Sequence, residues 1–476
     1  MNIHLLISFT LIITLISMFT GCDSEEEVIT EPTTTQTTVI TTAQTTEPTT
    51  EATTTPTTTI PTTISAQTSA PTPETTVPSE ISRSGWITED ETWSGIVHIT
   101  GDVWVDAEIT LTILPGTTIM FAAHQDDQHN GFAVPLDEWI ARHDDPTWTL
   151  EWAQSHCKLD VYGTLIARGT PDDMIVFTSD SLTPDGGDWL HVHIGNGSFV
   201  EFCVIEYSRG GLDVMEGTGD SVKISNNIIR HNFWTALTIH TGSSPTVTYN
   251  EIYDSGGHQG IAVIGEGSAP YIAYNNIREC KGGINIQPGT APIVEYNTLI
   301  DNDGGIGLLE TSASAVVRYN SISAPNGPTQ NWTYKGEPVY FSSILLGRND
   351  AISGISVADC SPIITYNGIS LCNSAGINIM GNSSPTINHN MITDCYAGFL
   401  LDESFTGSPS IEENNIYDNT YANILIWSEQ PIIATNNWWG TTDLAEIQAK
   451  ILSTQGQPAL GLVIFEPFLP EPVNIE

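Results

Sequence analysis

The chain has 476 residues, with 13 Lys and Arg against 56 Asp and Glu, and its formal net charge is −43. A nucleic-acid partner is excluded, because binding a polyanion takes clustered basic side chains and here they are few. The same balance argues against attraction to an anionic bilayer and makes cations the natural partners. Forty Gly, 27 Pro and 39% hydrophobic residues indicate a large core of β-strands and turns. Seven Cys do not make a disulfide framework.

The chain begins with an apolar run from Leu5 to Phe19, which is short for a transmembrane helix and suits a signal peptide. Phe-Thr-Gly then precedes Cys22, and this sequence resembles the lipobox of bacterial lipoproteins. The resemblance implies a signal peptide over 1–21, lipidation of Cys22, and attachment to the extracellular face of the cell membrane. The start of the chain departs from the pattern because Met1–His4 lacks Lys and Arg. An uncleaved anchor or an unlipidated signal peptide therefore stays open.

Residues 22–80 form a segment of low complexity that is rich in Thr, Pro and Glu. Thr occupies 24 of the 49 positions in 30–78, with little to bury. Such a segment cannot offset its ordering entropy, so we expect a disordered stalk that carries a folded domain over 81–470 away from the membrane. Within that domain we expect an insertion over 123–156 and a C-terminal cap over 436–470.

The folded domain contains an internal repeat. The sequence Ser-Pro-Thr-Val-Thr-Tyr-Asn-Glu-Ile begins at Ser244, and similar copies begin at 269, 291, 361, 384 and 408. The aligned Asn are 22–25 residues apart, except for one spacing of 47 residues, where one coil is degenerate or carries an insertion. At a tight corner an Asn hydrogen-bonds well, so we expect the repeated Asn to stack into a ladder. These Asn are Asn226, Asn250, Asn275, Asn297, Asn320, Asn367, Asn390, Asn414 and Asn436.

A second strand follows each Asn, and its apolar residues alternate at period two. Short strands with Gly, Pro and Asn corners at this period predict an all-β solenoid of about a dozen coils. We expect one inward column to run from Leu190 through Leu212 and Leu237. The pattern resembles the right-handed parallel β-helix family, the pectate-lyase-like solenoids with short parallel-β-helix repeats, over roughly 95–440. This family is a scaffold for many functions, so the resemblance implies a fold and no activity.

Outward side chains on these strands give two predicted columns, one starting at His191 and Asp213 and the other at His193 and His240. Imidazoles and a carboxylate on neighbouring coils can bind a transition metal or relay protons. The alternative is a set of solvent-exposed polar residues.

The insertion over 123–156 is rich in metal-ligating side chains, and we expect it to fold over the early outward columns; the alternative is an acidic surface loop. Its candidate residues are His124, Asp126, Asp127, His129, His143 and His156.

Three further columns carry possible chemistry. One holds stacked aromatic residues, which either line a sugar-binding face or pack at the corner: Tyr249, Tyr274, Tyr296, Tyr319, Tyr366 and His389. A column of acids after the Asn ladder suits Ca²⁺, although no dedicated calcium motif is present: Glu206, Asp254, Glu279, Asp301, Asp394 and Asp418, with Arg230 among them. Cys372 and Cys395 are placed either for a bridge or as buried thiols.

Two functions fit this sequence. One is a surface module that binds carbohydrate or another cell-surface component. The other is a polysaccharide lyase or glycosidase with a His/Asp site on the N-terminal coils, either with or without a metal ion. The lyases of the resembled family use Arg or Lys with Ca²⁺, and its glycosidases use clustered Asp. The sequence has eight Arg and five Lys and places Asp213 and Asp402 far apart on the strand face. It therefore favours binding over catalysis.

Overall fold

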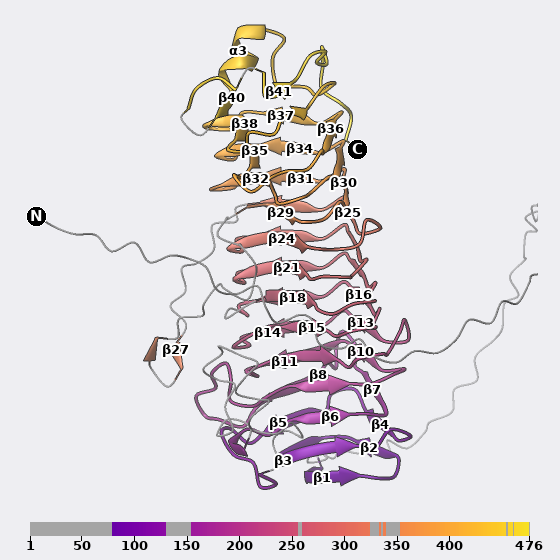
Figure 1. Ribbon diagram of the computed structural model, residues 1–476. Helices are drawn as coiled ribbons and strands as arrows, with labels where there is room; N and C mark the ends of the chain where they lie inside the picture. Colours follow the sequence, from indigo (N-terminus) through magenta and orange to yellow (C-terminus); the bar gives the residue numbers. More distant parts are fainter. Residues whose placement is uncertain are drawn as a thin grey trace, which may run out of the picture. The chain divides into compact units, whose positions relative to one another are not determined.

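The computed structural model describes residues 79–129, 154–255, 259–323, 333–334, 337–338, 353–453, 456–459 and 461–475. Short strands pair in parallel with strands of the next coil, and the coils stack along one axis (Figure 1). The predicted all-β parallel solenoid is confirmed.

Sheet 1 has 14 parallel strands. Its members, in spatial order, are β2 (Glu91–Trp93), β4 (Thr110–Ile113), β7 (Thr164–Arg168), β10 (Phe199–Glu201), β13 (Lys223–Ser225), β16 (Thr246–Thr248), β19 (Tyr271–Ala273), β22 (Ile293–Glu295), β25 (Val316–Arg318), β30 (Ile363–Thr365), β33 (Thr386–Asn388), β36 (Ser410–Glu412), β39 (Ile432–Ile433) and β41 (Val463–Ile464).

Sheets 2 and 3 are joined by two long strands, β1 (Glu80–Ile87) and β3 (Ile96–Val105), which pair along both. Sheet 2 continues through β5 (Thr118–Phe121), β8 (Ile175–Ser179), β11 (Cys203–Glu206), β14 (Ile228–Arg230), β17 (Glu251–Tyr253), β20 (Asn276–Arg278), β23 (Thr298–Ile300), β26 (Ser321–Ser323), β31 (Gly368–Ser370), β34 (Met391–Thr393) and β37 (Asn415–Tyr417). Sheet 3 continues through β6 (Leu159–Val161), β9 (Val192–Ile194), β12 (Leu212–Val214), β15 (Leu237–Ile239), β18 (Gln259–Val263), β21 (Gly282–Ile286), β24 (Gly304–Leu309), β29 (Ile355–Ala358), β32 (Ala375–Met380), β35 (Ala397–Leu401), β38 (Ala422–Ile426) and β40 (Ile451–Ser453).

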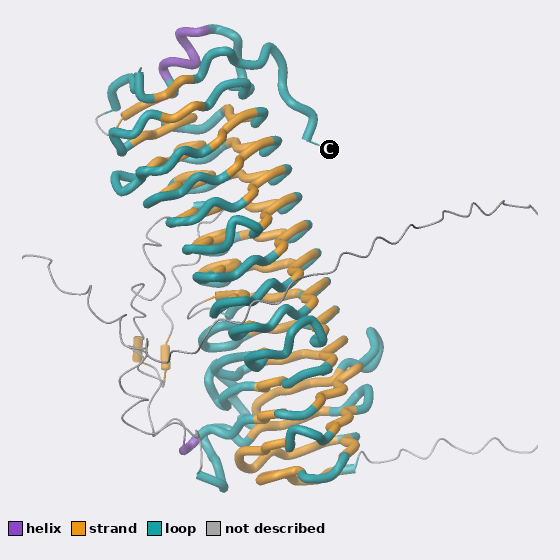
Figure 2. Tube along the Cα trace, turned by 45° about the vertical axis from the view of Figure 1, so that its right-hand side comes forward, coloured by secondary structure: helices purple, strands orange, loops and turns teal. Residues whose placement is uncertain are grey.

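The remaining elements lie outside these stacks. Strands β27 (Thr333–Tyr334) and β28 (Glu337–Pro338) form an antiparallel pair. Helix α3 (Leu444–Ala449) follows the last full coil, and the side chain of Asp443 caps it by accepting from the backbone N–H groups of Ala445 and Glu446. Figure 2 shows this helix at one end of the stacked strands. Among the described residues, no helix is long and apolar enough to cross a membrane.

The core runs through the middle of the coils, where each strand turns one or two apolar side chains inward. Leu212, Leu237 and Ile261 lie side by side in sheet 3 and are completely or almost completely buried. The residue before them in this column is Val192, whereas the sequence predicted Leu190. The first coil of the predicted column is thus shifted by two residues, because its approach to the strand is longer than in later coils.

The 47-residue spacing in the repeat is an insertion, and no coil is hidden within it. The side chain of Asn320 hydrogen-bonds directly to Asn367, and β26 pairs directly with β31. Sheets 1 and 3 are equally continuous there, since β25 pairs with β30 and β24 with β29. The coil that ends at Ser323 and the coil that begins after Ser353 are therefore direct neighbours in the solenoid.

A ladder of buried Asn side chains follows the corner between sheets 1 and 2. Each Asn amide accepts, through its Oδ1, both the backbone N–H and the side-chain N–H of the Asn one coil earlier, as Asn297 does from Asn275 at 2.9 Å. The interior members are those predicted, from Asn250 to Asn414. At the two ends the ladder residues are Asn227 and Asn437, not the predicted Asn226 and Asn436.

Asn226 and Asn436 occupy a neighbouring corner position instead. Both have a φ of +57°, and the intervening coils have Tyr at this left-handed position from Tyr249 to Tyr366, followed by His389 and Glu413. Asn tolerates left-handed backbone well, so either Asn of the Asn-Asn pair suits either position on propensity alone. The sequence repeat was therefore misaligned by one residue at these two coils.

Candidate functional site

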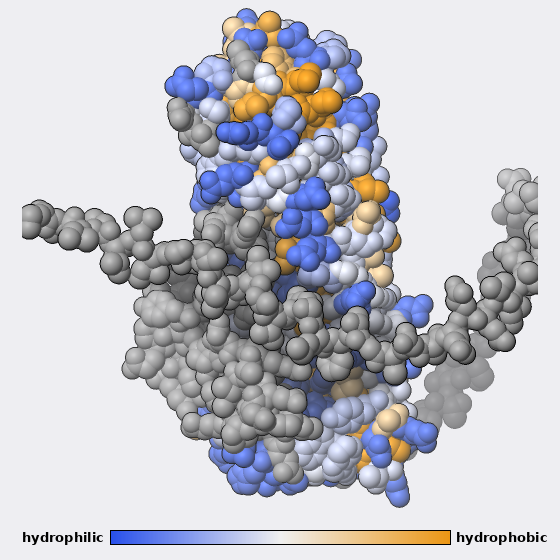
Figure 3. All heavy atoms as spheres, viewed as in Figure 1, coloured by the Kyte–Doolittle hydropathy of each residue, from blue (hydrophilic) through white to orange (hydrophobic). Residues whose placement is uncertain are grey.

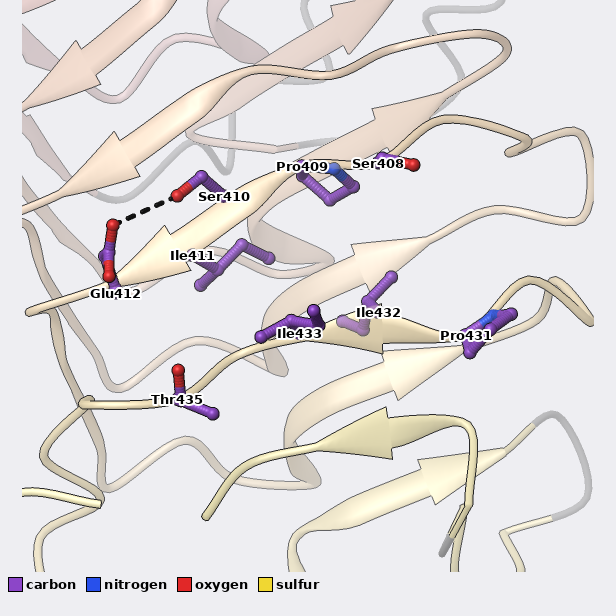
Figure 4. Close-up of a pocket in the computed structure, with 9 residues that line it drawn as sticks. All are labelled: Ser408, Pro409, Ser410, Ile411, Glu412, Pro431, Ile432, Ile433 and Thr435. Atoms are coloured by element: carbon purple, nitrogen blue, oxygen red, sulfur yellow. Dashed lines mark hydrogen bonds between the residues drawn. The ribbon is translucent and has the colours of Figure 1, made fainter. Parts of the chain in front are cut away.

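Clustered His and Asp side chains lie at the N-terminal end of the described solenoid. The other end holds a pocket of about 280 Å³ between β36 and β39, shown in Figure 4, whose lining includes Ile411, Ile432 and Ile433. Its one titratable lining residue is Glu412, which accepts a hydrogen bond from Ser410 at 3.2 Å. On the face seen in Figure 3, hydrophobic residues also gather toward the C-terminal coils. A second pocket at this end, of about 610 Å³, is lined by Asp418, Glu446 and Lys450. Among the described residues, the one group of His and Asp side chains placed to share a metal ion lies in the N-terminal coils.

The outward face of sheet 3 changes character along the axis. In its first coils, strand pairing lines up Trp86, Trp104, Asp160, His193 and Asp213 in one column. The same column continues with small or neutral residues: Thr238, Ala262, Asn285, Gly307, Ser356 and Asn378. The aromatic and ionisable residues of this column are thus confined to its first coils.

The polar cluster, defined here as Lys158, Asp160, His191, His193, Asp213 and His240, is built on β6, β9 and their neighbours. Asp160 is the centre: its Oδ2 lies 2.6 Å from Lys158 Nζ, and its Oδ1 lies 3.2 Å from His191 Nε2. The same Oδ1 is 3.8 Å from His193 Nδ1. On its other side, His191 has Nδ1 3.8 Å from Asp213 Oδ2. The structure therefore brings together the four residues predicted from the sequence.

Their arrangement differs from the predicted columns. His193, not His191, pairs with Asp213, because the coil is shifted by two residues. The imidazole of His193 lies between the other two, with ring centroids 5.6 Å from His191 and 5.7 Å from His240. The aligned residue of the coil before is Asp160, which the sequence did not reveal.

Burial and charge set the protonation of this cluster. Burial lowers the pKa of His193 from 6.5 to about 4, and the neighbouring His191 adds to the effect. Burial opposes the charge on Asp160, but the hydrogen bond to His191 and the ammonium of Lys158 outweigh it and lower the pKa. Burial likewise opposes the charge on Lys158, yet Asp160 and Asp102 raise its pKa. Near neutral pH the cluster thus holds an ammonium–carboxylate pair beside a neutral imidazole.

A second carboxyl lies beneath this cluster. Asp102 is fully buried, and its Oδ1 accepts from the backbone N–H of Lys158 at 3.1 Å. Burial raises the pKa of Asp102 to about 8, with a further contribution from Asp126. At neutral pH the carboxyl of Asp102 is therefore protonated, while that of Asp160 is ionised.

Two of the described insertion residues, His124 and His156, form a separate group with Asp188 at the edge between sheets 2 and 3. His124 Nδ1 lies 2.7 Å from His156 Nε2, and His124 Nε2 lies 3.2 Å from Asp188 Oδ1. Asp126 has a structural role, because its Oδ1 accepts from the backbone N–H groups of Asp102 and Gln128.

Two other predicted insertion residues, Asp127 and His129, lie apart from this group. Asp127 accepts from Thr100 Oγ1 at 2.6 Å, and His129 Nδ1 lies 3.3 Å from the carbonyl of Gln154. His143 lies outside the described residues.

An aromatic cluster adjoins the polar cluster. The ring of Trp86 stacks on Trp104 with centroids 5.6 Å apart and on Tyr162 at 6.1 Å. Lys158 Nζ lies 5.9 Å from the centroid of Trp104, which links the two clusters. Trp86 is 60% exposed and also lines a pocket of about 410 Å³ with Arg83. A large exposed aromatic surface thus lies beside buried polar groups.

The Tyr column is a stack of rings at the corner next to the Asn ladder. Neighbouring centroids from Tyr249 to His389 are 4.7–5.0 Å apart, and the rings are inclined by 2–25°. Each inner ring covers the faces of its neighbours, so only its edge meets solvent. Because sugars stack on aromatic faces, this geometry favours packing over the sugar-binding alternative.

The predicted acid column combines two positions. Asp254, Glu279 and Asp301 share a left-handed corner, where φ is between +49° and +55°, and Asp394 and Asp418 repeat that conformation. Glu206 and Arg230 belong one position earlier, within sheet 2. There Arg230 Nε lies 2.8 Å from Glu206 Oε2.

The cysteines carry no cross-link in the described structure. Cys157, Cys203, Cys280, Cys360, Cys372 and Cys395 are all free and buried. Of the two alternatives for Cys372 and Cys395, the structure has buried thiols.

Asp160, Lys158, Trp86 and Trp104 are the functional candidates that sequence reasoning missed. The available signal was the period-two pattern of 158–162, whose outward positions are Lys158, Asp160 and Tyr162. That pattern alone did not identify 158–162 as part of a coil, because this segment follows the insertion and has neither the Asn corner nor the Gly-Ile strand of the repeat.

Comparison with known proteins addresses the fold. The family model described as "right handed beta helix region" matches residues 186–322 and 341–439. Among curated proteins, no sequence matches. The solved structure of DFA-IIIase from Arthrobacter chlorophenolicus A6 without its lid is similar at 14% identity, covering 70% of this chain and 88% of its own, with a TM-score of 0.39. The Dettilon tailspike protein is similar at 13% identity, covering 71% and 60%, with a TM-score of 0.32.

Both solved structures are distant, and nothing about function follows from them. The family match and the observed strand pairing agree over the central and C-terminal coils. The chain is therefore a right-handed parallel β-helix protein.

Proposed function

We propose that the protein binds carbohydrate through the outward face of its first coils. The observation that supports this proposal is that the aromatic cluster, in which Trp86 is 60% exposed, lies next to the polar cluster around Asp160. Aromatic rings provide apolar area for the faces of sugars, while His193, Asp213 and His240, the partly exposed members of the polar cluster, can accept and donate the hydrogen bonds that orient hydroxyl groups. The net charge of −43 favours neutral over anionic chains.

Binding to immobilised neutral and acidic polysaccharides tests this proposal. The full-length protein is expected to bind a neutral chain, and Trp86→Ala is expected to weaken binding at least tenfold. Trp427→Ala is the matched control, because Trp427 is 44% exposed and lies in the C-terminal coils. Absence of binding across the panel, or equal losses in the two variants, would contradict the proposal.

We further propose that this surface is displayed outside the cell on a lipid anchor at Cys22. The support is the apolar run that ends at Cys22 and the Thr-rich segment that follows it. Mass spectrometry of the N-terminal peptide is expected to show an acylated Cys22, and Cys22→Ala should release the protein from membranes. An unmodified Cys22 in the membrane fraction would refute the anchor.

A polysaccharide-active enzyme is the second candidate. The observation in its favour is the contrast in protonation between the ionised Asp160 and the neutral His193 in one column, since such contrasts assign bases and acids. Against it, Asp102, the protonated carboxyl of this region, is fully buried and therefore closed to a substrate. Release of reducing or unsaturated ends from the same panel would establish catalysis, and its loss in Asp160→Asn would assign it to this site.

A further inference from the structure

We propose that Asp160, His191 and His193 bind a divalent transition-metal ion, for which Zn²⁺ is the probe. This inference goes beyond carbohydrate binding and does not depend on it. The three side chains offer one carboxylate and two imidazoles, and one atom from each lies within 4.8 Å of the others.

The fold presents the two histidines together. His191 and His193 are two residues apart at β9, and the intervening Val192 is buried in the core. Because side chains alternate along a strand, both imidazoles lie on the outward face. Asp160 reaches them from β6, whose Asp160 pairs directly with His193. Two neighbouring strands thus supply all three donors from rigid positions.

The distances suit a small ion. Donors at about 2.0–2.1 Å from tetrahedral Zn²⁺ lie roughly 3.3 Å from one another. His191 Nε2 is 3.2 Å from Asp160 Oδ1, and His193 Nδ1 is 3.8 Å from the same oxygen. A small rotation of the His193 ring therefore closes a three-donor site. Two imidazoles and a carboxylate select a transition metal over Ca²⁺, which prefers oxygen donors.

The contacts among the protein's own residues leave one member of the group unexplained. The ion pair of Lys158 with Asp160 and the hydrogen bond of His191 explain those residues as a structural network. They do not explain His193: its Nδ1 lies 3.8 Å from Asp160 Oδ1, too far for a hydrogen bond, and its buried Nε2 has no hydrogen-bond partner among the described residues. An ion bound by Nδ1 would give the ring a partner on the side of Asp160.

Outer residues are placed to support the site. Asp213 Oδ2 lies 3.8 Å from the second nitrogen of His191, where a slight closure would let it accept the Nδ1–H and fix the ring. Metal-binding histidines are commonly held by such carboxylates. Lys158 takes the oxygen of Asp160 that faces away from the imidazoles. Its positive charge reduces metal affinity and also keeps Asp160 ionised and oriented.

Titration of metal-stripped, full-length protein with Zn²⁺ tests the site by calorimetry, and Co²⁺ reports its geometry by visible absorption. The wild type is expected to bind one equivalent of each, with the intense d–d bands of four- or five-coordinate cobalt. His193→Ala should abolish this binding. His231→Ala is the matched control, because His231 also pairs with a carboxylate, Asp254 at 2.7 Å, but does not belong to the proposed site. This variant should bind like the wild type.

A graded variant guards against loss through misfolding. Asp213→Asn keeps the size of the side chain and is expected to weaken Zn²⁺ affinity about 10- to 100-fold while one equivalent still binds. Zn²⁺ should raise the thermal unfolding midpoint of the wild type and of His231→Ala, but not of a folded His193→Ala. No stoichiometric binding by the wild type, or full binding by His193→Ala, would overturn the site. Because Trp86→Ala leaves all three ligands in place, it should retain zinc whatever its effect on carbohydrate binding.

Discussion

At the scale of single residues, the most unusual group is a carboxyl kept neutral inside the protein. Asp102 is fully buried where β3 passes from sheet 2 to sheet 3, and Lys158 supplies a backbone N–H to it. Burial raises its pKa to about 8. In the unfolded chain the same group ionises near pH 4, so between about pH 4 and 8 the native state holds a proton that the unfolded state has lost. Stability contributed by this group is therefore present below pH 4 and lost as the pH rises through 8.

Asp102→Asn is expected to remove this loss, because an amide keeps the shape and the accepting oxygen but does not ionise. Relative to the wild type, the variant should gain at least about 1 kcal/mol of unfolding free energy between pH 5 and pH 8. Urea unfolding at the two pH values measures it. Asp172→Asn, at an exposed position, should show no such gain. Parallel pH profiles for wild type and Asp102→Asn would rule out the neutral carboxyl.

Part of the polar cluster could be predicted from the sequence, because the chain has only 12 His and two of them, His191 and His193, stand two residues apart. Asp160 was inaccessible for a physical reason: its partners come from other coils, and strand register there depends on how the chain leaves and re-enters the solenoid around the insertion. From the sequence alone Trp86 has no identifiable aromatic neighbour. Only the pairing of β1 with β3 places it beside Trp104. Residue type was thus enough to identify the two histidines as candidates, but their neighbours depend on the strand register, which the sequence does not show.

At the scale of elements, the corner between sheets 1 and 2 combines the Asn ladder with the Tyr stack. Asn297 is buried and donates through Nδ2 to the carbonyls of Ile272 and Glu295 as well as to Asn320. It also accepts two N–H groups from Asn275. The side chain therefore satisfies backbone groups that the turn itself leaves without partners.

Asn297→Ala is expected to destabilise the protein by at least about 2 kcal/mol, because it leaves more than one buried polar group without a partner. Chemical denaturation measures the change. Asn276→Ala is the control, since Asn276 is the exposed first residue of β20, one coil before Asn297, and its cost should be within about 0.5 kcal/mol. Equal costs for the two variants would show that the ladder does not stabilise the corner.

The Tyr stack makes a different prediction, because its residues adopt left-handed backbone. Tyr296 has a φ of +55° and stacks on Tyr274 and Tyr319. Tyr296→Ala should lose both pairs, about 1–3 kcal/mol in total, while keeping the strained backbone. Tyr296→Gly should recover roughly 1 kcal/mol of that loss, since glycine adopts positive φ freely. If Tyr296→Ala has the same free energy of unfolding as the wild type, the Tyr stack does not stabilise the protein.

At the scale of the whole molecule, the sequence was sufficient for the architecture and insufficient for its boundaries. A repeat whose Asn recur every 22–25 residues permits almost no fold but a solenoid, because each coil leaves apolar residues that only a neighbour covers. The repeat does not constrain the coils before Asn227, where it fades. It also could not say whether the 47-residue spacing hid a coil, because length alone fits both.

The continuity of all three sheets across that spacing predicts that the inserted segment is dispensable for folding. Replacing residues 325–351 with a connector as short as 301–303 of an earlier coil should leave the strand content by circular dichroism unchanged and the thermal midpoint within a few degrees. The ladder bond from Asn320 to Asn367 already spans the junction at 3.0 Å. An insoluble or unfolded deletion variant, next to a soluble wild type, would show that the segment is part of the core.

The Asn ladder has a consequence for how such a chain changes over time. The interior rungs are chemically alike, and each bonds to the rungs and the backbone of its own and neighbouring coils. Gain or loss of one complete repeat by unequal recombination would preserve all these bonds, whereas a shift of one residue within a repeat would break them. The chain could thus lengthen or shorten in whole turns and hold extra residues between two turns, as it does between Ser323 and Ser353. The polar cluster, which depends on particular neighbours in the first coils, does not share this tolerance and is inherited as one block.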